Sequence, residues 1–240
     1  MKLENHIEHY KVDAEYFDYL DLDKFTVQEI RRRYEEIFHL YELKNNDNIL
    51  EIGAGAGFAL NHIDVATQNY FPLDISTHNL KRVREKTKGE IYPISGDVFN
   101  LPFSSDSFDF ILLSEVLEHL NDPVMALKEI QRVLKTSGSF IVSVPYNETI
   151  SYQMCIHCNK PTPTNAHLHS FYEKKLEKLV KSAGLTPIKT SKCLSKAANR
   201  LHFNLLTKSF PFPLWKIFDK TFNSIIDKAS SIIVLAKKQN

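Results

Sequence analysis

Apolar and polar positions along this chain form short blocks whose period changes between that of a strand and that of a helix. From residue 49 onward, apolar runs typical of buried strands are separated by segments in which apolar residues recur every three or four positions. Such alternation predicts a mostly parallel sheet covered by helices. Seven strands are predicted, at residues 49–52, 69–73, 90–94, 108–113, 139–144, 186–193 and 230–235.

Helical spacing of apolar residues predicts three helices. One spans residues 26–42 and one spans residues 171–183; the helix between them starts at Asp122 and Pro123 and has Val124, Leu127, Ile130 and Val133 on one face. Thr26 is expected to cap the first helix and Ser170 the third, each within a capping box. Gly138 is expected to close the second helix and Gly184 the third. The three arginines at 31–33 are predicted to lie on a solvated face, because adjacent residues on a helix point in different directions.

Composition narrows the class of protein. With 240 residues, 43% of them apolar, the chain can bury one sizeable core, so we expect a single domain. Lys plus Arg number 30 against 29 Asp plus Glu, and this balance gives no reason to expect a nucleic-acid partner. Three cysteines predict no disulfide framework, residues 1–6 lack a signal-peptide core, and no apolar run approaches the roughly 20 residues of a membrane span. We therefore expect a cytoplasmic protein. The sequence does not indicate its oligomeric state.

The most informative segment is residues 49–57, a short apolar strand that runs into three alternating glycines. Gly53, Gly55 and Gly57 lack Cβ atoms, so the backbone can adopt left-handed dihedrals and approach a ligand closely, and the segment that follows can open a helix. The spacing departs from a dinucleotide fingerprint, whose third glycine would stand where Phe58 does. The turn predicts a nucleoside cofactor other than a dinucleotide.

Three acids stand at the ends of successive predicted strands: Glu51, Asp74 and Asp97. In a doubly wound sheet, ligands bind along this edge, so we expect the three carboxylates to converge on one crevice. Asp74 could accept both hydroxyls of a ribose, Asp97 an adenine amine, and Glu51 would suit a cationic amino-acid moiety. The alternative is that each acid only caps a helix.

With these residues in place, the chain resembles the class I S-adenosylmethionine-dependent methyltransferases, specifically the small family with an E-x-G-x-G-x-G turn. The resemblance covers roughly residues 45–194. Its motifs occur in the correct order, at residues 50–57, 73–76, 96–97, 101–103, 107–109, 115–120 and from 138 onward. It implies an α/β, Rossmann-like fold with a seven-stranded mostly parallel sheet, helices on both faces, an N-terminal helical extension, and insertions after strand five and between strands six and seven.

The resemblance also implies a cofactor, S-adenosyl-L-methionine, and the residues that contact it. The glycine turn would contact the methionine part, Asp74 the ribose and Asp97 the adenine. The full set of implied contacts is Glu51, Gly53, Ala54, Gly55, Gly57, Asp74, Ile75, Asp97, Val98 and Ser114.

Methyl transfer to a hydroxyl or thiol requires removal of a proton, and His119 is the candidate catalytic base. Equally, His119 could orient a loop or contact the cofactor. Some relatives use a similar E-x-x-E-H segment, here Glu115, Glu118 and His119, to bind a divalent ion. A later histidine completes that site, and His167 or His169 could supply it. Such a metal would lower the pKa of an acceptor hydroxyl and make a base unnecessary.

A second metal hypothesis concerns a structural zinc site. Cys155 and Cys158 have C-x-x-C spacing, and His167 and His169 follow within eleven residues of Cys158. Two thiolates and two imidazoles could surround zinc tetrahedrally and fix the insertion in place. A reduced thiol pair exposed to solvent is the alternative.

Residues 196–228 combine an aromatic entry with an amphipathic helix that carries lysines. We expect this segment to fold over the active site as a lid, with peripheral membrane contact as the alternative; both indicate a small-molecule or lipid-like acceptor. The predicted organisation is a helical cap (1–44), a cofactor-binding core (45–145), a Cys/His insertion (146–170) and this aromatic insertion.

The leading hypothesis is thus an enzyme that methylates a small or lipid-like acceptor, on oxygen. Its rival is a non-catalytic cofactor-binding module that acts as a scaffold or regulator. A nicotinamide oxidoreductase is disfavoured by Phe58 and by the position of Asp97.

Overall fold

A computed structural model describes residues 6–16, 22–156, 158–200, 203–226 and 228–239. The predicted cap and both insertions each include residues outside these ranges, so they are described only in part. Among the described helices, none is both long enough and apolar enough to cross a bilayer.

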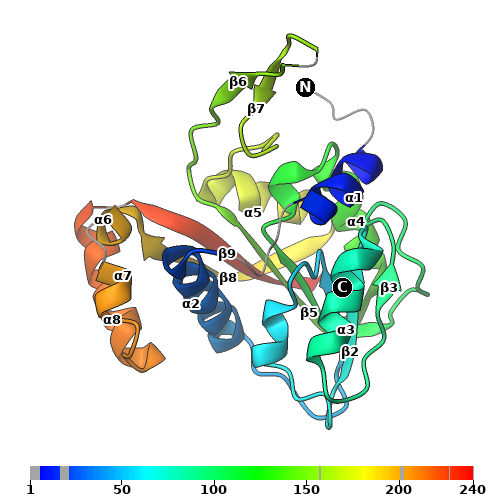
Figure 1. Cartoon of the computed structure of the whole chain (residues 1–240). Coiled ribbons are helices and arrows are strands. Elements are labelled where there is room, and N and C mark those ends of the chain that lie inside the picture. Colours follow the sequence, from blue (N-terminus) through cyan, green and yellow to red (C-terminus); the bar gives the residue numbers. More distant parts are fainter. Residues whose placement is uncertain (1–5, 17–21, 157, 201–202, 227, 240) are drawn as a thin grey trace.

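Seven strands form one mixed sheet, in the order β3-β2-β1-β4-β5-β9-β8. Strands β1 to β5 pair in parallel, whereas β9 runs antiparallel to both of its neighbours. The predicted mostly parallel sheet is therefore confirmed (Figure 1). Its strands are β1 Asn48–Ile52, β2 Asn69–Asp74, β3 Ile94–Ser95, β4 Phe108–Ser114, β5 Leu134–Pro145, β8 Leu185–Ser195 and β9 Ala229–Lys238.

Strand β3 is much shorter than expected. The sequence predicted residues 90–94, but only Ile94 and Ser95 pair with β2. Pro93 lies directly before Ile94 and has no amide hydrogen to donate to a neighbouring strand. Tyr92 makes a single main-chain bond to Tyr70, which holds this edge close to β2 without extending the ladder.

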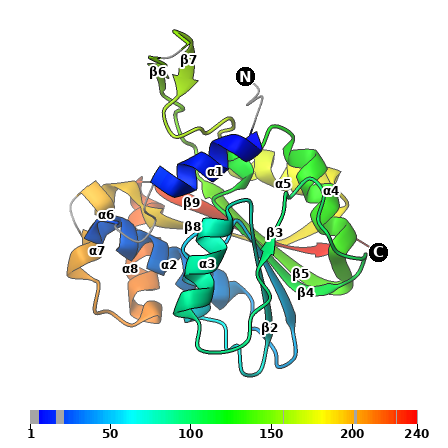
Figure 2. The same ribbon diagram turned by 45° about the vertical axis from the view of Figure 1, so that its right-hand side comes forward.

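Helices cover both faces of the sheet (Figures 1 and 2). Helices α2, α3 and α8 lie on one face, and α4 and α5 on the other. A hairpin of β6 (Tyr152–Met154) and β7 (Pro161–Pro163) projects from the body. The helices are α1 His6–Tyr16, α2 Lys24–Leu40, α3 Thr77–Lys86, α4 Pro123–Val133, α5 Glu173–Ser182, α6 Lys196–Arg200, α7 Phe203–Leu206 and α8 Phe212–Ile226, with single 3-10 turns η1 Phe58–Asn61 and η2 Leu117–His119.

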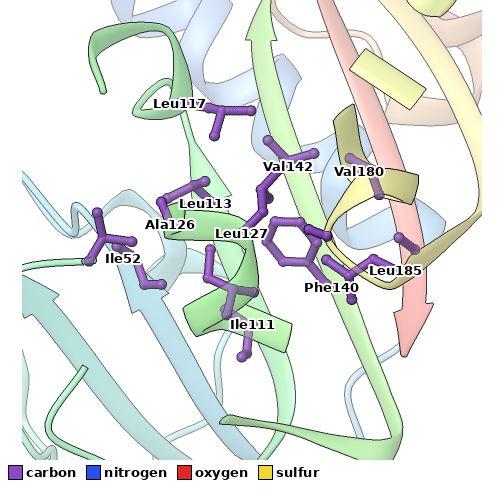
Figure 3. Close-up of a cluster of buried hydrophobic side chains, with 14 of the residues drawn as sticks. Ile52, Ile111, Leu113, Leu117, Ala126, Leu127, Phe140, Val142, Val180 and Leu185 are labelled. Atoms are coloured by element: carbon purple, nitrogen blue, oxygen red, sulfur yellow. The ribbon is translucent and has the colours of Figure 1, made fainter. Parts of the chain in front are cut away.

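Each face of the sheet has its own hydrophobic core, because a parallel sheet exposes apolar side chains in both directions. Figure 3 shows the core beneath α4 and α5, where Leu127 lies against Phe140 of β5. The opposite core gathers residues of α2, η1 and α8 around strands β1, β4 and β9. Helix α8 packs against β8, at the edge of the sheet, through the buried Trp215. Its main contacts are with β8 and α6, at the edge of the sheet, and a lid over the active site stays a prediction.

Three predicted helix ends are wrong. Helix α2 begins two residues earlier, because Asp23 caps it and Thr26 donates its hydroxyl to Asp23 instead of capping. Ser170 donates to the carbonyl of Glu148, so α5 begins without a side-chain cap. Gly138 lies within β5, where a Cβ would come within 3.0 Å of the Phe108 carbonyl oxygen. In contrast, Gly184 follows α5 with a φ of +79°, as expected.

Of the arginine run at 31–33, only Arg31 lies on a solvated face as predicted. Arg32 is completely buried, and its guanidinium donates to the carbonyls of Thr207 (2.8 Å) and Phe210 (3.0 Å). The segment after α7 covers this part of α2, and its carbonyls need donors once they are shielded from water. Arg33 is also largely buried and forms an ion pair with Glu115. Periodicity within α2 could not reveal either partner, because both come from distant segments.

The core beneath α4 gives a direct test of packing. Leu127 is completely buried, whereas Met125 on the same helix is 50% exposed. We expect Leu127→Ala to lower the free energy of unfolding by about 2 to 5 kcal/mol, because it leaves a cavity as well as removing apolar contacts. Met125→Ala should change it by less than about 1 kcal/mol. Urea denaturation of both variants measures the two losses of unfolding free energy. Equal losses would contradict the assignment of Leu127 to the core.

Candidate functional site

The candidate site lies where the order of the sheet reverses. Strand β1 pairs with β2 on one side and with β4 on the other, so the chain moves outward in opposite directions from this point. In open α/β sheets, ligands bind at the carboxyl ends of strands beside such a reversal. The loops after β1, β2 and β4 therefore define the site.

The glycine turn after β1 has the predicted geometry. Gly53, Gly55 and Gly57 have φ values of +73°, +48° and +72°, which side chains rarely allow. A Cβ on Gly53 would lie 2.4 Å from a methyl carbon of Val116, so this glycine also lets the loop after β4 approach. The amides of Gly53 and Ala54 both donate to the Leu73 carbonyl, which ties the turn to β2. The helix expected after the glycines is only the 3-10 turn η1.

Asp74, at the end of β2, organises the same turn. Its carboxylate accepts the amides of Gly55 (2.9 Å) and Ser76 (2.8 Å), so it links the two loops directly. Burial raises the pKa of Asp74 above its usual value. Ile75 continues this loop and is partly exposed. A ligand that takes hydrogen bonds from Asp74 would therefore contact the glycine turn as well.

Asp97 and Val98 follow β3. Asp97 is partly exposed, and its carboxylate accepts the amide of Phe99 at 3.1 Å. Val98 is buried beside the core that supports this edge. The loop is thus fixed in place, with the Asp97 carboxylate in a tight local turn.

Glu51 lies in a position that the sequence did not predict. It is 1% exposed, and its carboxylate accepts hydrogen bonds from the hydroxyls of Tyr34 (2.9 Å) and Tyr70. Burial raises the pKa of Glu51 to about 7, and repulsion from Asp74 adds to this effect. Glu51 and Asp74, two of the three predicted acids, are therefore close enough to interact. However, the Glu51 carboxylate is buried against the two tyrosine hydroxyls and does not open into the crevice. In the sequence, Tyr34 is only one of the apolar residues of the predicted helix 26–42, and Tyr70 is only one of those in the predicted strand 69–73.

The end of β4 is strained. Ser114 shares a hydrogen bond with Ser143 of β5, at 2.8 Å between hydroxyl oxygens. Glu115 follows with a φ of +55°, a left-handed conformation that is costly for a residue with a side chain. Arg33 of α2 holds its carboxylate at 2.6 Å, and the Ser143 hydroxyl donates to the same group. Strain retained in this way is common at functional sites.

Beyond this bend, Glu118, His119 and His167 form a compact cluster. One potential metal-ligand atom from each lies within 4.8 Å of the others. Glu118 is 1% exposed, and neither of its carboxylate oxygens has a hydrogen-bond partner among the described residues. Burial and the nearby Glu115 raise its pKa well above the usual value, whereas burial and His167 lower the pKa of His119 to about 4. A buried carboxylate without donors is costly, so this cluster fits a cation.

The Cys/His insertion delivers His167 to this cluster by main-chain contacts. The amides of Leu168 and His169 both donate to the carbonyl of Glu118. His167 Nδ1 lies 2.5 Å from a carboxylate oxygen of Glu148, which leaves Nε2 available as a ligand atom. A carboxylate behind a histidine is the usual arrangement around a ligating imidazole. Tyr10 of α1, which the sequence analysis missed, packs its ring against His119 at 5.7 Å between centroids.

The four residues predicted to bind zinc are not brought together. Cys155 and Cys158 lie in the turn of the projecting β6–β7 hairpin. His169 Nε2 lies 2.8 Å from the carbonyl oxygen of Leu120, while His167 belongs to the cluster with Glu118. Within the described part of the chain, no group of three potential ligands includes a cysteine. The spacing of these residues was suitable for zinc, but the hairpin carries the thiols away from the imidazoles.

A cavity of about 410 Å³ lies between α2 and η1. Val27, Ile30 and Phe58 give it apolar walls, and Arg31 and His62 add polar groups. Phe58 directly follows the glycine turn, so the cavity adjoins the candidate cofactor loop. Its volume is that of a typical small-molecule pocket.

The raised pKa of Glu51 predicts a specific dependence of stability on pH. Between pH 4.5 and about 7, the folded protein holds a proton on Glu51 that the unfolded chain releases, so the free energy of unfolding falls as pH rises through this window. We expect Glu51→Gln to remove this contribution, and the variant should gain stability relative to the wild type from pH 5 to pH 8. Urea denaturation across this range tests the prediction, and parallel curves for the two proteins would contradict the raised pKa of the buried Glu51.

Comparisons with known proteins agree with this geometry. Residues 50–142 match a family model described as a methyltransferase domain. An uncharacterized protein of Methanocaldococcus jannaschii is 35% identical over 118 residues, covering 49% of this chain and 50% of that protein. A 2-methyl-6-phytyl-1,4-hydroquinone methyltransferase of Oryza sativa is 31% identical over 106 residues, covering 42% and 32%. The chain thus spans half or less of the length of these relatives.

A solved structure extends the likeness to nearly the whole chain. The 1,6-didemethyltoxoflavin-N1-methyltransferase of Burkholderia thailandensis, bound to 1,6-didemethyltoxoflavin and S-adenosylhomocysteine, has a TM-score of 0.64 at 17% identity, and the match covers 98% of this chain and 88% of that one. At this identity the likeness concerns the fold. Residues 50–142 thus match a methyltransferase domain, and the chain has the fold of the class I S-adenosylmethionine-dependent methyltransferases.

Proposed function

We propose that this protein transfers a methyl group from S-adenosyl-L-methionine to a hydroxyl oxygen of a small-molecule acceptor that has an apolar part. The observation that carries the proposal is the left-handed glycine turn tied to Asp74 at the reversal of the sheet. It offers a backbone surface and a carboxylate to one ligand, which is what an adenosine-bearing sulfonium requires.

The cofactor would lie across the three loops. The turn from Gly53 to Gly57 would contact the methionine part, and Asp74 would accept the ribose hydroxyls. Asp97 and Val98 would hold the adenine, one by a hydrogen bond and the other by apolar contact, with Ser114 at the far edge. Glu51 would act through its charge: an ammonium group nearby favours the ionised carboxylate, so cofactor binding should lower the pKa of Glu51.

The cavity between α2 and η1 is the candidate acceptor pocket. Its apolar walls of Val27, Ile30 and Phe58 suit the apolar part of an acceptor, and its polar groups could orient the hydroxyl. The Oryza sativa relative is named for a phytyl hydroquinone, a molecule with a long hydrocarbon chain and phenolic hydroxyls. That name supports a lipid-like acceptor here.

A divalent cation is the proposed partner of Glu118, His119 and His167. The unpartnered carboxylate oxygens of Glu118 would bind it, and the low pKa of His119 keeps the imidazole neutral and able to ligate at pH 7. When bound, such an ion lowers the pKa of an acceptor hydroxyl. The same neutral imidazole could accept the hydroxyl proton directly, so loss of activity on metal removal would separate the two roles of His119.

Calorimetry distinguishes the proposal from its rivals. The protein should bind S-adenosylhomocysteine and not a nicotinamide dinucleotide. Screening acceptors with isotopically labelled cofactor would then reveal the product. Binding without transfer to any acceptor would favour a regulatory module, and absence of S-adenosylhomocysteine binding would refute the proposal.

We expect Asp74→Ala to weaken S-adenosylhomocysteine binding by about 1 to 3 kcal/mol, because it removes charge-assisted hydrogen bonds to the ribose and loosens the glycine turn. Asp106→Ala is the matched control, since Asp106 is an exposed acid at the opposite end of β4. Calorimetric titration compares them. An unchanged affinity in Asp74→Ala would contradict the assignment.

Manganese binding tests the proposed cation site. The wild type should bind Mn²⁺, and Glu118→Gln should weaken binding by more than the roughly 10- to 100-fold cost of outer-shell changes, because a direct ligand is lost. His169→Gln should leave the affinity unchanged, since His169 contacts the Leu120 carbonyl and not the cluster. Isothermal titration with Mn²⁺ measures all three. Equal affinities in the two variants would argue against this site.

A further inference from the structure

Helix α8 has two apolar sides, and only one is covered. Trp215 (2% exposed) and Asp219 lie on the inner side, where Asp219 accepts the amides of Leu194 and Ser195 in β8. A helix at the surface of a domain normally turns polar residues outward. The exposed side of α8 follows this rule only in part, because large apolar side chains are exposed there beside Lys220, Thr221 and Ser224.

Five large apolar side chains are exposed on α7 and α8, and we call them the α7–α8 patch. They are Leu206 (74% exposed), Leu214 (41%), Ile217 (64%), Phe218 (37%) and Ile225 (75%). Leu214, Phe218 and Ile225 follow one another at spacings of four and seven, so they form a single stripe with Ile217 beside it. A continuous apolar stripe of this kind marks a surface that meets another apolar phase.

Charge indicates what covers the patch. Residues 196–228 contain five lysines and one arginine but only two aspartates. Asp219 is buried and faces inward, and Asp227 lies outside the described residues. Lys208 and Lys220 are exposed, two residues after Leu206 and one turn after Ile217 respectively. The described rim of the patch is therefore cationic.

From this combination we propose that the α7–α8 patch binds the surface of an anionic lipid membrane. Apolar side chains would enter the interface, and the lysines would contact acidic headgroups. A second copy of the chain fits less well, because a two-fold interface would bring the cationic rims together. No helix needs to cross the bilayer for this contact.

The position of the patch links it to the candidate acceptor pocket. Arg31 lines the cavity between α2 and η1, and it donates to the Lys208 carbonyl at 3.2 Å, next to the patch. On the membrane, the cavity would therefore lie beside the lipid surface. If the proposed function holds, a lipid-like acceptor could pass from the bilayer into the pocket without crossing water.

Vesicle sedimentation tests the membrane contact without requiring methyl transfer. The full chain should sediment with vesicles of phosphatidylglycerol and phosphatidylcholine, and about tenfold less with pure phosphatidylcholine. The double variant Ile217→Glu/Ile225→Glu should lose about tenfold or more of the binding, because charges replace inserted side chains. Both positions are exposed, so the fold should tolerate the changes.

Met125→Glu is the matched control, because Met125 is a half-exposed apolar residue on α4, across the sheet. It should bind vesicles as the wild type does. Wild-type protein that binds S-adenosylhomocysteine yet ignores both vesicles would overturn this inference and leave the proposed function intact. A dimer that dissociates in the double variant, without vesicle binding, would show that a second copy covers the patch and would also overturn it.

Discussion

The left-handed turn at residues 53–57 is the constraint on which the rest of this site depends. Without side chains, the turn can bend back so that its amides reach Leu73 and Asp74 at the end of β2. The missing Cβ of Gly53 also admits Val116 from the loop after β4. One turn thus fixes the positions of both neighbouring loops, and any side chain at its first position would push them apart.

The same edge of the sheet carries four carboxylates, which differ in their hydrogen-bond donors. Glu51 is held by two tyrosine hydroxyls, Glu115 by Arg33, and Asp74 by main-chain amides, so each of these acids has its own donors. Glu118 is different, because no described group donates to it. A buried carboxylate without donors has a raised pKa or acquires a partner, and burial lowers the pKa of the neighbouring His119, so this imidazole does not supply positive charge to Glu118 at neutral pH.

The two insertions start beside each other, where Lys196 donates to the Tyr146 carbonyl at 2.9 Å, and they contribute different features. The insertion after β5 brings His167 to the strained end of β4, where its main chain bonds to Glu118. The insertion between β8 and β9 packs on α2 through Arg32 and Trp215, and it exposes an apolar face. The central sheet is common to many proteins, so the acceptor and the location of the reaction would be set by these added segments together with α2 and η1, which line the proposed acceptor pocket.

Periodicity and glycine spacing were enough to predict the strands, the sheet and the left-handed turn, because they reflect local preferences of the backbone. The exception was β3, where Pro93 ended pairing. Tertiary structure alone decided the partners of the polar groups. Tyr34 and Tyr70 donate to Glu51, and Arg32 donates to main-chain carbonyls. His167, and not His169, lies beside Glu118. These contacts join residues far apart in the chain, and their energies depend on burial, which no local pattern encodes.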